Sequence, residues 1–206
     1  MHHSGTLYTI SAPSGAGKTS LVKALVEQDS QLFVSVSHTT RRQRSGEENG
    51  VNYYFVSRES FEEAVRNETF FEWAEVFGNL YGTAIEPVER QLQAGHDVIL
   101  EIDWQGAAQV KKRVPESIHI FILPPSLEVL HQRLVGRGQD SAEVIEGRMA
   151  QAQNELVHWS EADYLVVNDR FEQALDDLKH IVASQRLNRR SQSHKLASQL
   201  ADLTQN

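Results

Sequence analysis

The stretch that decides the fold is Ile10-Ser11-Ala12-Pro13-Ser14-Gly15-Ala16-Gly17-Lys18-Thr19-Ser20. An apolar run rich in strand formers precedes it at 7–10, and apolar residues at helical spacing follow it at 21–26. A strand, a Gly-rich turn and a helix that opens with Gly-Lys-Thr form the P-loop arrangement. In such a turn the backbone N–H groups curl around an anion, and the helix N-terminus adds positive dipole character. The stretch therefore predicts a nucleotide-binding site.

The residues expected to bind the phosphates are Ala12, Pro13, Ser14, Gly15, Ala16, Gly17, Lys18 and Thr19. Lys18 can reach the outer phosphates of a nucleoside triphosphate, and the Thr19 hydroxyl can ligate Mg²⁺. Ala12 stands where the motif usually has glycine, which alanine can replace if its φ is negative. The alternative is an ordinary Gly-rich turn between a strand and a helix, and the lysine and threonine argue against it.

The amino-acid composition limits the functions that this chain could have. The chain is 40% hydrophobic and 23% charged, as expected of a soluble globular protein. It has no cysteine, which excludes disulfides and thiolate metal sites and fits a reducing compartment. We find no signal peptide and no apolar run of roughly 18 residues, so we expect a cytoplasmic protein without a membrane partner. The net charge of −8 argues against a nucleic-acid partner, and a local cluster of cations would have to attract any anionic ligand.

The order of predicted elements indicates an α/β fold. Five strand-like runs, at 7–10, 33–37, 98–103, 118–123 and 164–167, alternate with helical patterns and predict a mostly parallel five-stranded sheet flanked by helices. We expect one domain over 1–206, with 1–37, 84–125 and 161–206 as its core. Residues 38–83 form a mixed β/α insertion with strand-like runs at 51–56 and 70–79, and residues 126–160 form a helical lid.

The insertion carries cations and hydroxyls that suit a phosphate group. They are Arg41, Arg44, Tyr53 and Tyr81. Arginine binds phosphate oxygens with two parallel hydrogen bonds, and a tyrosine hydroxyl adds a neutral donor. A solvated run of charges is the alternative.

Glu72 lies in the aromatic run Phe70-Phe71-Glu72-Trp73. A carboxylate held there needs two donors, and guanine supplies such a pair at N1–H and N2–H₂, whereas adenine does not. The hydroxyls of Ser37 and Thr83 could donate to the guanine acceptors. Such a site rejects the wrong base, because its buried polar groups would be left unpaired. Taken alone, a strand glutamate that faces solvent is the simpler interpretation.

Further charged residues follow the later strands. Glu101 and Asp103 differ by two, so on a strand they point to one side, near the P-loop, where they suit Mg²⁺ or a nucleotide. Helix capping is an alternative for Asp103. Arg133 and Arg137 stand four apart, and Arg148 follows on the next helix. These helices are typical of a mobile lid that brings charge to a transferring phosphoryl group, although exposed helices often carry arginine.

Together these motifs resemble those of the guanylate kinase family over about residues 7–186. The matching segments are 12–19, 35–41, Arg44-x-Gly46-Glu47, Asn49-Gly50, Tyr53, 71–74, 78–83, 102–106, 133–138 and 167–169. The resemblance implies a P-loop kinase fold that uses MgATP as donor and GMP or dGMP as acceptor. Thr83 stands where serine also occurs in the family, and Glu101 where aspartate is common.

The resemblance also implies roles by position. Ser37, Glu72 and Thr83 would contact guanine; Arg41, Arg44, Tyr53 and Tyr81 would bind the GMP phosphate; Lys18, Arg41, Arg137 and Arg148 would be catalytic; Arg133, Asn168 and Asp169 would lie at the donor nucleotide. Whether Glu101 and Asp103 contact GMP or Mg²⁺ stays open. Two rival functions are a non-catalytic guanylate-kinase-like binding module and a P-loop kinase for another phosphorylated acceptor. The oligomeric state also stays open, a homo-oligomer included.

Overall fold

The computed structural model describes residues 5–76, 78–136 and 141–204. Its larger sheet has five parallel strands in the order β2-β7-β1-β8-β9, which confirms the expected α/β class. The strands are β1 (Leu7–Ser11), β2 (Leu32–Val34), β7 (Asp97–Glu101), β8 (Ile118–Leu123) and β9 (Tyr164–Val167).

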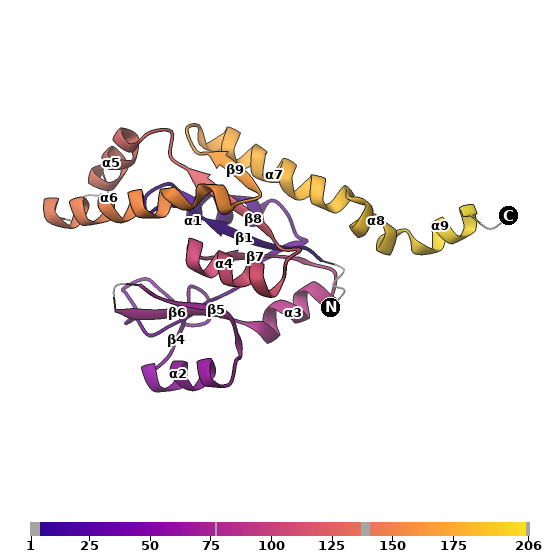
Figure 1. Cartoon of the computed structure of the whole chain (residues 1–206), viewed down its shortest axis with the longest axis horizontal. Helices are drawn as coiled ribbons and strands as arrows, with labels where there is room; N and C mark the ends of the chain where they lie inside the picture. The colour runs from indigo at the N-terminus through magenta and orange to yellow at the C-terminus, as the bar shows by residue number, and fades with distance from the viewer. Residues whose placement is uncertain (1–4, 77, 137–140, 205–206) are drawn as a thin grey trace.

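Helices cover both faces of this sheet because its strands are apolar on both sides. β1 is buried throughout. Tyr8 and Ile10 face the helices α1 (Lys18–Glu27) and α7 (Phe171–Leu187), whereas Leu7 faces α3 (Ile85–Gln93) and α4 (Trp104–Arg113). Figure 1 shows α3 and α4 on the side of the sheet that faces the second sheet, and α7 on the other side. The P-loop follows β1, so it lies at the carboxyl edge of the central strand.

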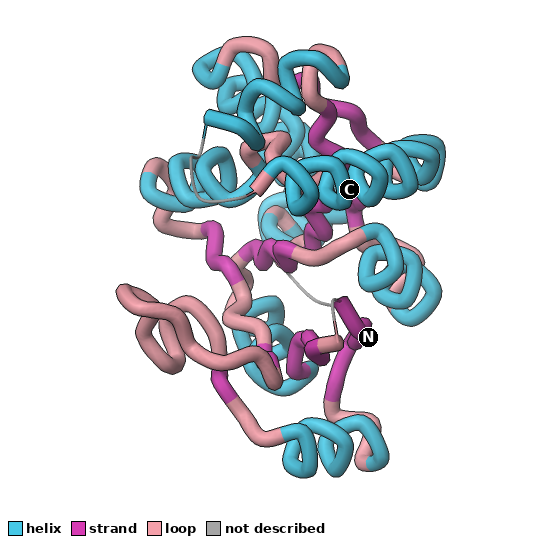
Figure 2. Tube along the Cα trace, turned by 90° about the vertical axis from the view of Figure 1, so that its left-hand side faces the viewer, coloured by secondary structure: helices cyan, strands magenta, loops and turns pink. Residues whose placement is uncertain are grey.

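A second sheet and one helix form the lower part of the molecule in Figures 1 and 2. Its order is β4-β3-β6-β5, from β3 (His38–Thr39), β4 (Tyr54–Phe55), β5 (Phe70–Val76) and β6 (Asn79–Ala84). Its small core contains Phe61 of α2 (Arg58–Arg66), with Phe70 and Leu80.

Two expected strands are shorter than predicted. The strand expected at 33–37 ends at Val34, because the chain then changes sheets: Ser35 N–H donates to Ile99 O in the larger sheet, and Ser37 O accepts from Tyr54 N–H. The strand expected at 51–56 is only β4. Asn49 Oδ1 accepts from Phe55 N–H, and such local side-chain bonds compete with a strand ladder.

Two helices follow β8 above the larger sheet. α5 (Leu127–Gly136) begins after Ser126, whose hydroxyl accepts from Val129 N–H, and α6 (Ala142–Leu156) begins after Ser141 in the same way. At Val157 the chain changes from α6 into the 3₁₀ turn η1 (Val157–Glu161), within the segment 126–160 that was expected to be helical. There His158 stacks on Trp104 with ring centroids 3.4 Å apart.

After α7 the chain forms two short helices, α8 (Arg189–Lys195) and α9 (Ala197–Thr204), which extend away from the sheet in Figure 1. Among the described residues, no helix combines the length and apolarity needed to cross a membrane.

Candidate active site

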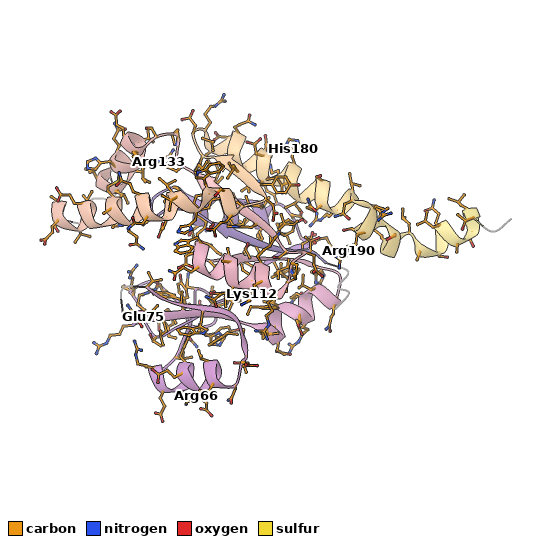
Figure 3. All side chains as sticks on the ribbon, viewed as in Figure 1. Arg66, Glu75, Lys112, Arg133, His180 and Arg190 are labelled. Atoms are coloured by element: carbon orange, nitrogen blue, oxygen red, sulfur yellow. The ribbon has the colours of Figure 1, made fainter. Side chains whose placement is uncertain are left out.

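One cleft of about 1100 Å³ brings together side chains from the P-loop, the second sheet, the end of β7 and α6. Those that the sequence singled out are Ala12, Pro13, Ser14, Gly15, Gly17, Lys18, Thr19, Ser37, Arg44, Tyr53, Glu72, Tyr81, Glu101, Asp103 and Arg148. Figure 3 labels Glu75 on β5, below the larger sheet, and Arg133 on α5, above it. A single cavity thus joins the predicted phosphate site to the predicted base site.

The P-loop has the geometry of an anion nest. Gly15 and Gly17 both have a φ of 93°, a conformation that favours glycine. A Cβ at Gly17 would also lie 2.3 Å from the side-chain nitrogen of Asn168, so any other residue would be strained and would displace that side chain. Ala12 has no positive φ, which is the condition under which alanine can replace the usual glycine.

Lys18, at the start of α1, lies at the floor of the cleft. Its Nζ donates to Ile102 O at 2.9 Å. Burial lowers the pKa of Lys18, and the carboxylates of Glu101 and Asp103 partly oppose that effect. A partly desolvated ammonium among acids is well placed to balance the charge of a bound polyphosphate.

Glu101, the last residue of β7, and Asp103, two residues beyond it, have different roles. β7 ends at Glu101, whose Oε1 accepts a short hydrogen bond from the Thr19 hydroxyl. Asp103 has left the strand and caps α4, its Oδ1 accepting from Gly106 N–H at 2.8 Å. The expectation that both point to one side of a strand is therefore wrong, although both line the cleft, and the capping alternative for Asp103 is confirmed.

Glu72 is buried at 4% exposure in the middle of β5. Among the described residues, no group donates a hydrogen bond to its Oε1. Burial raises the pKa of Glu72 to about 7, and hydrogen bonds from Thr83 oppose that rise. The Ser37 and Thr83 hydroxyls, 3.1 Å apart, are hydrogen-bonded to each other. The simpler interpretation, a glutamate facing solvent, is wrong: this carboxylate is buried, one of its oxygens lacks a donor, and it lines the cleft.

Arg41 of the insertion lies beside two tyrosine rings. The Arg41 guanidinium lies 5.4 Å from the ring centroid of Tyr53, and the rings of Tyr53 and Tyr81 are 5.9 Å apart. Glu47 holds the segment in place, because its carboxylate accepts from Arg41 at 2.7 and 3.1 Å and from the Arg44 N–H at 2.8 Å. The sequence pattern did not assign this positioning role to Glu47.

Two residues of α6 contact the P-loop at Ser14. Arg148 donates to the Ser14 hydroxyl at 2.7 Å, and Glu155 Oε2 accepts from the Ser14 N–H at 3.2 Å. The sequence analysis did not single out Glu155, yet its spacing of seven from Arg148 places both on one helix face and could have indicated it. Arg137, expected to be catalytic, lies outside the described residues.

Two of the three residues expected at the donor nucleotide are linked to the P-loop by hydrogen bonds. Asn168 is buried, and its side-chain nitrogen donates to Ala16 O at 2.7 Å. Arg133 in turn donates to Asn168 O at 2.9 Å. Asp169 follows Asn168 at the end of β9 and is exposed. None of these three lines the cleft as the described residues define it.

The raised pKa of Glu72 makes a prediction about stability. Its pKa rises from 4.5 in the unfolded chain to about 7 in the folded one, so the folded chain retains the proton more tightly. The free energy of unfolding therefore falls as pH rises between these values, and the loss is complete above the folded pKa. We expect Glu72→Gln to stabilise the unliganded chain by about 2–3 kcal/mol at about pH 8.5 and by much less at about pH 5.

Urea unfolding of the two proteins at both pH values measures this difference. Glu75→Gln is the matched control, because Glu75 lies on the same strand but is exposed. An equal stabilisation by Glu72→Gln at both pH values would contradict the prediction.

Comparisons with known proteins agree with this geometry. The profile of the family described as guanylate kinase matches residues 4–185. A protein named guanylate kinase from Pseudomonas fluorescens is 57% identical over 202 residues, which cover 98% of each chain. One from Hahella chejuensis is 60% identical over 183 residues, covering 89% of this chain and 88% of its own. The crystal structure of guanylate kinase from Anaplasma phagocytophilum is similar with a TM-score of 0.77 at 32% identity, covering 92% of this chain and 90% of that one.

Proposed function

The chain belongs to the guanylate kinase family, and we propose that it transfers the γ-phosphoryl group of ATP to GMP or dGMP, giving ADP and the diphosphate. The observation that carries this proposal is Glu72, a buried carboxylate with an unpartnered oxygen beside the P-loop cleft. A nucleotide kinase for guanine needs such a group next to its phosphate site. Neither a binding module nor a kinase for an acceptor without a base would need it.

We propose that three parts of the chain have different roles. The core (1–37, 84–125, 161–206) binds the donor phosphates at its P-loop, and the insertion (38–83) binds the acceptor. Residues 126–160 act as the lid, through Arg148 and Arg137. Arg133, Asn168 and Asp169 support the donor side, Asn168 by fixing the P-loop backbone at Ala16.

Glu72 selects the base. Its carboxylate would accept from guanine N1–H and N2–H₂, while the hydroxyls of Ser37 and Thr83 face the acceptor edge. The donors of guanine would stabilise the charged carboxylate and so lower the pKa that burial raises. Adenine would leave the buried Oε1 of Glu72 without a partner, which costs more than a missing contact alone.

The acceptor phosphate would be bound by Arg41, Arg44, Tyr53 and Tyr81. Its second pKa is near 6, so near neutral pH it is already largely an anionic nucleophile and needs no general base. The protein must instead hold two polyanions in line and cancel their repulsion. Lys18 and Arg148 supply charge from the P-loop and the lid, and Arg41 supplies it from the insertion.

Magnesium fits the donors at the P-loop. The Thr19 hydroxyl and the Glu101 carboxylate meet there, and hard oxygen donors are those that Mg²⁺ prefers. The described residues hold no group of three or more Asp, Glu or His that could bind a metal by themselves, which fits an ion held largely by substrate phosphates. When bound, the ion would neutralise charge on the donor phosphates.

A panel of acceptors tests the function. With MgATP as donor, we expect GMP and dGMP to be phosphorylated at kcat/KM values about 10⁴-fold above that of AMP, because a site built for hydrogen bonds rejects a base that lacks them. UMP, dTMP and a ribose bisphosphate complete the panel, and ADP release measured by a coupled assay gives the rates. Equal turnover of AMP and GMP would contradict base selection by Glu72. Turnover of the ribose bisphosphate alone would establish the rival kinase.

A further inference from the structure

Gly106 lies in the first turn of α4, directly against the carboxylate of Glu72. A Cβ at this position would lie 2.8 Å from Glu72 Oε2 and 3.3 Å from its Cδ. We propose that Gly106 determines the base specificity of the site, because its missing side chain leaves the space in which the Glu72 carboxylate lies. We call this space the Gly106 seat. The role deepens the proposed function and rests on it.

Two polar clamps fix the Gly106 seat relative to β5. The Gln109 side chain accepts from Trp73 N–H at 3.2 Å and donates to Trp73 O at 2.9 Å, one residue beyond Glu72. Arg113 donates to Phe70 O at 2.9 Å. Residues 106, 109 and 113 recur at the spacing of one helix face, so a single face of α4 holds the strand that carries Glu72.

Neither backbone conformation nor capping accounts for the glycine. Gly106 is helical and has no positive φ, and its N–H bond to Asp103 is available to any residue except proline. In a helix glycine is less favourable than alanine by about 0.5–1 kcal/mol. The structural use that remains for the glycine is therefore space. A Cβ there would meet the Ile102 Cβ at 3.3 Å and, more closely, the Glu72 carboxylate at 2.8 Å.

Alanine at this position would push the carboxylate away from α4. The contact of 2.8 Å is shorter than real Cβ contacts, and the end of the Glu72 side chain is the part that can move. A shift of the carboxylate breaks a pair of hydrogen bonds to the guanine edge, because such bonds weaken steeply with distance and angle. The donor site at the P-loop would be unaffected.

Gly106→Ala tests the proposal with kinetics. We expect the KM for GMP to rise roughly tenfold, the cost of one weakened charge-assisted bond, while the KM for ATP changes less than about twofold. The fold should persist because alanine favours the helix, and urea unfolding checks this. Lys112→Ala is the matched control, since Lys112 lies on the same helix and is exposed. An unchanged KM for GMP would overturn the proposal.

A double-mutant cycle separates a direct steric role from a general effect on α4. Glu72→Asp shortens the side chain and withdraws the carboxylate from the Gly106 seat. On the E72D background, Gly106→Ala should therefore raise the KM for GMP less than about twofold. If Gly106→Ala raises the KM for GMP by the same factor in both backgrounds, the proposed role of the Gly106 seat is overturned.

A measurement without nucleotide distinguishes failure of the seat from failure of the proposed function. In ¹³C-glutamate NMR of the unliganded chain, Gly106→Ala should move the pKa of Glu72 from about 7 toward its ordinary value, because the displaced carboxylate enters the open cleft. An unmoved pKa would overturn the seat even if GMP is the substrate. If the unaltered chain fails to phosphorylate GMP, the proposed function falls, and with it the specificity role of Gly106, whatever the NMR result.

Discussion

Lys18→Met should lower kcat for GMP phosphorylation by about 10³-fold, the largest effect that we expect from one substitution. The Lys18 ammonium lies at the floor of the cleft between the P-loop and Ile102 O, where it can follow the phosphoryl group from donor to acceptor. Methionine keeps much of the length and removes the charge. Because the repulsion between the two phosphorylated substrates is then uncompensated, the loss should fall on kcat more than on either KM.

Lys23→Met is the matched control for this experiment. Lys23 lies on the same helix, and its side chain is 76% exposed in a pair with Glu27. An exposed pair of this kind contributes little, so kcat should stay within about twofold. Equal losses from the two substitutions would mean that general damage to α1, and not the charge at Lys18, lowers the rate.

Glu72→Gln should raise the KM for GMP by about 100-fold or more while the KM for ATP stays within about twofold. Glutamine has nearly the same shape but turns an N–H₂ donor toward the donor edge of guanine, so that hydrogen bonds are lost and two donors face each other. The separation of the two KM values is the informative result, because Glu72 and the P-loop line the same cleft. Initial rates with each substrate varied in turn provide the measurement.

Glu75→Gln again serves as the control, since Glu75 lies three residues further along β5 and is exposed. A rise in the KM for ATP and not for GMP would place the acceptor elsewhere. If Glu72→Gln weakens GMP binding and also stabilises the unliganded chain above the pKa of Glu72, stability is traded against base binding at this residue, as is usual at functional sites.

Much of the molecule could be predicted from local sequence patterns. The strand–turn–helix around Lys18, the five apolar strand segments and the caps at Ser57, Asp103, Ser126 and Ser141 depend on neighbours in the chain, so short-range rules suffice for them. The cations of the insertion and the aromatic surroundings of Glu72 were also visible. The ends of two strands could not be predicted in this way. The segment 33–37 changes sheets after Val34, and a side-chain hydrogen bond shortens the strand expected at 51–56.

Glu72 shows where local patterns stop being sufficient. By its sequence alone, a strand glutamate most simply faces solvent; in the structure it is buried with an unpartnered oxygen because α4 packs on β5. The same packing places Gly106 against the Glu72 carboxylate, and the contact between α6 and Ser14 places Glu155 at the P-loop.

The sequence by itself determined the P-loop, the α/β class and the residue types of the two proposed nucleotide sites, since each depends on spacing within a short segment. The tertiary structure alone decided which carboxylate is buried and which glycine makes room for another side chain. Those properties arise from contacts between segments far apart in the chain, such as Glu72 against Gly106 and Ser14 against Glu155, and no local pattern contains the distances that create them.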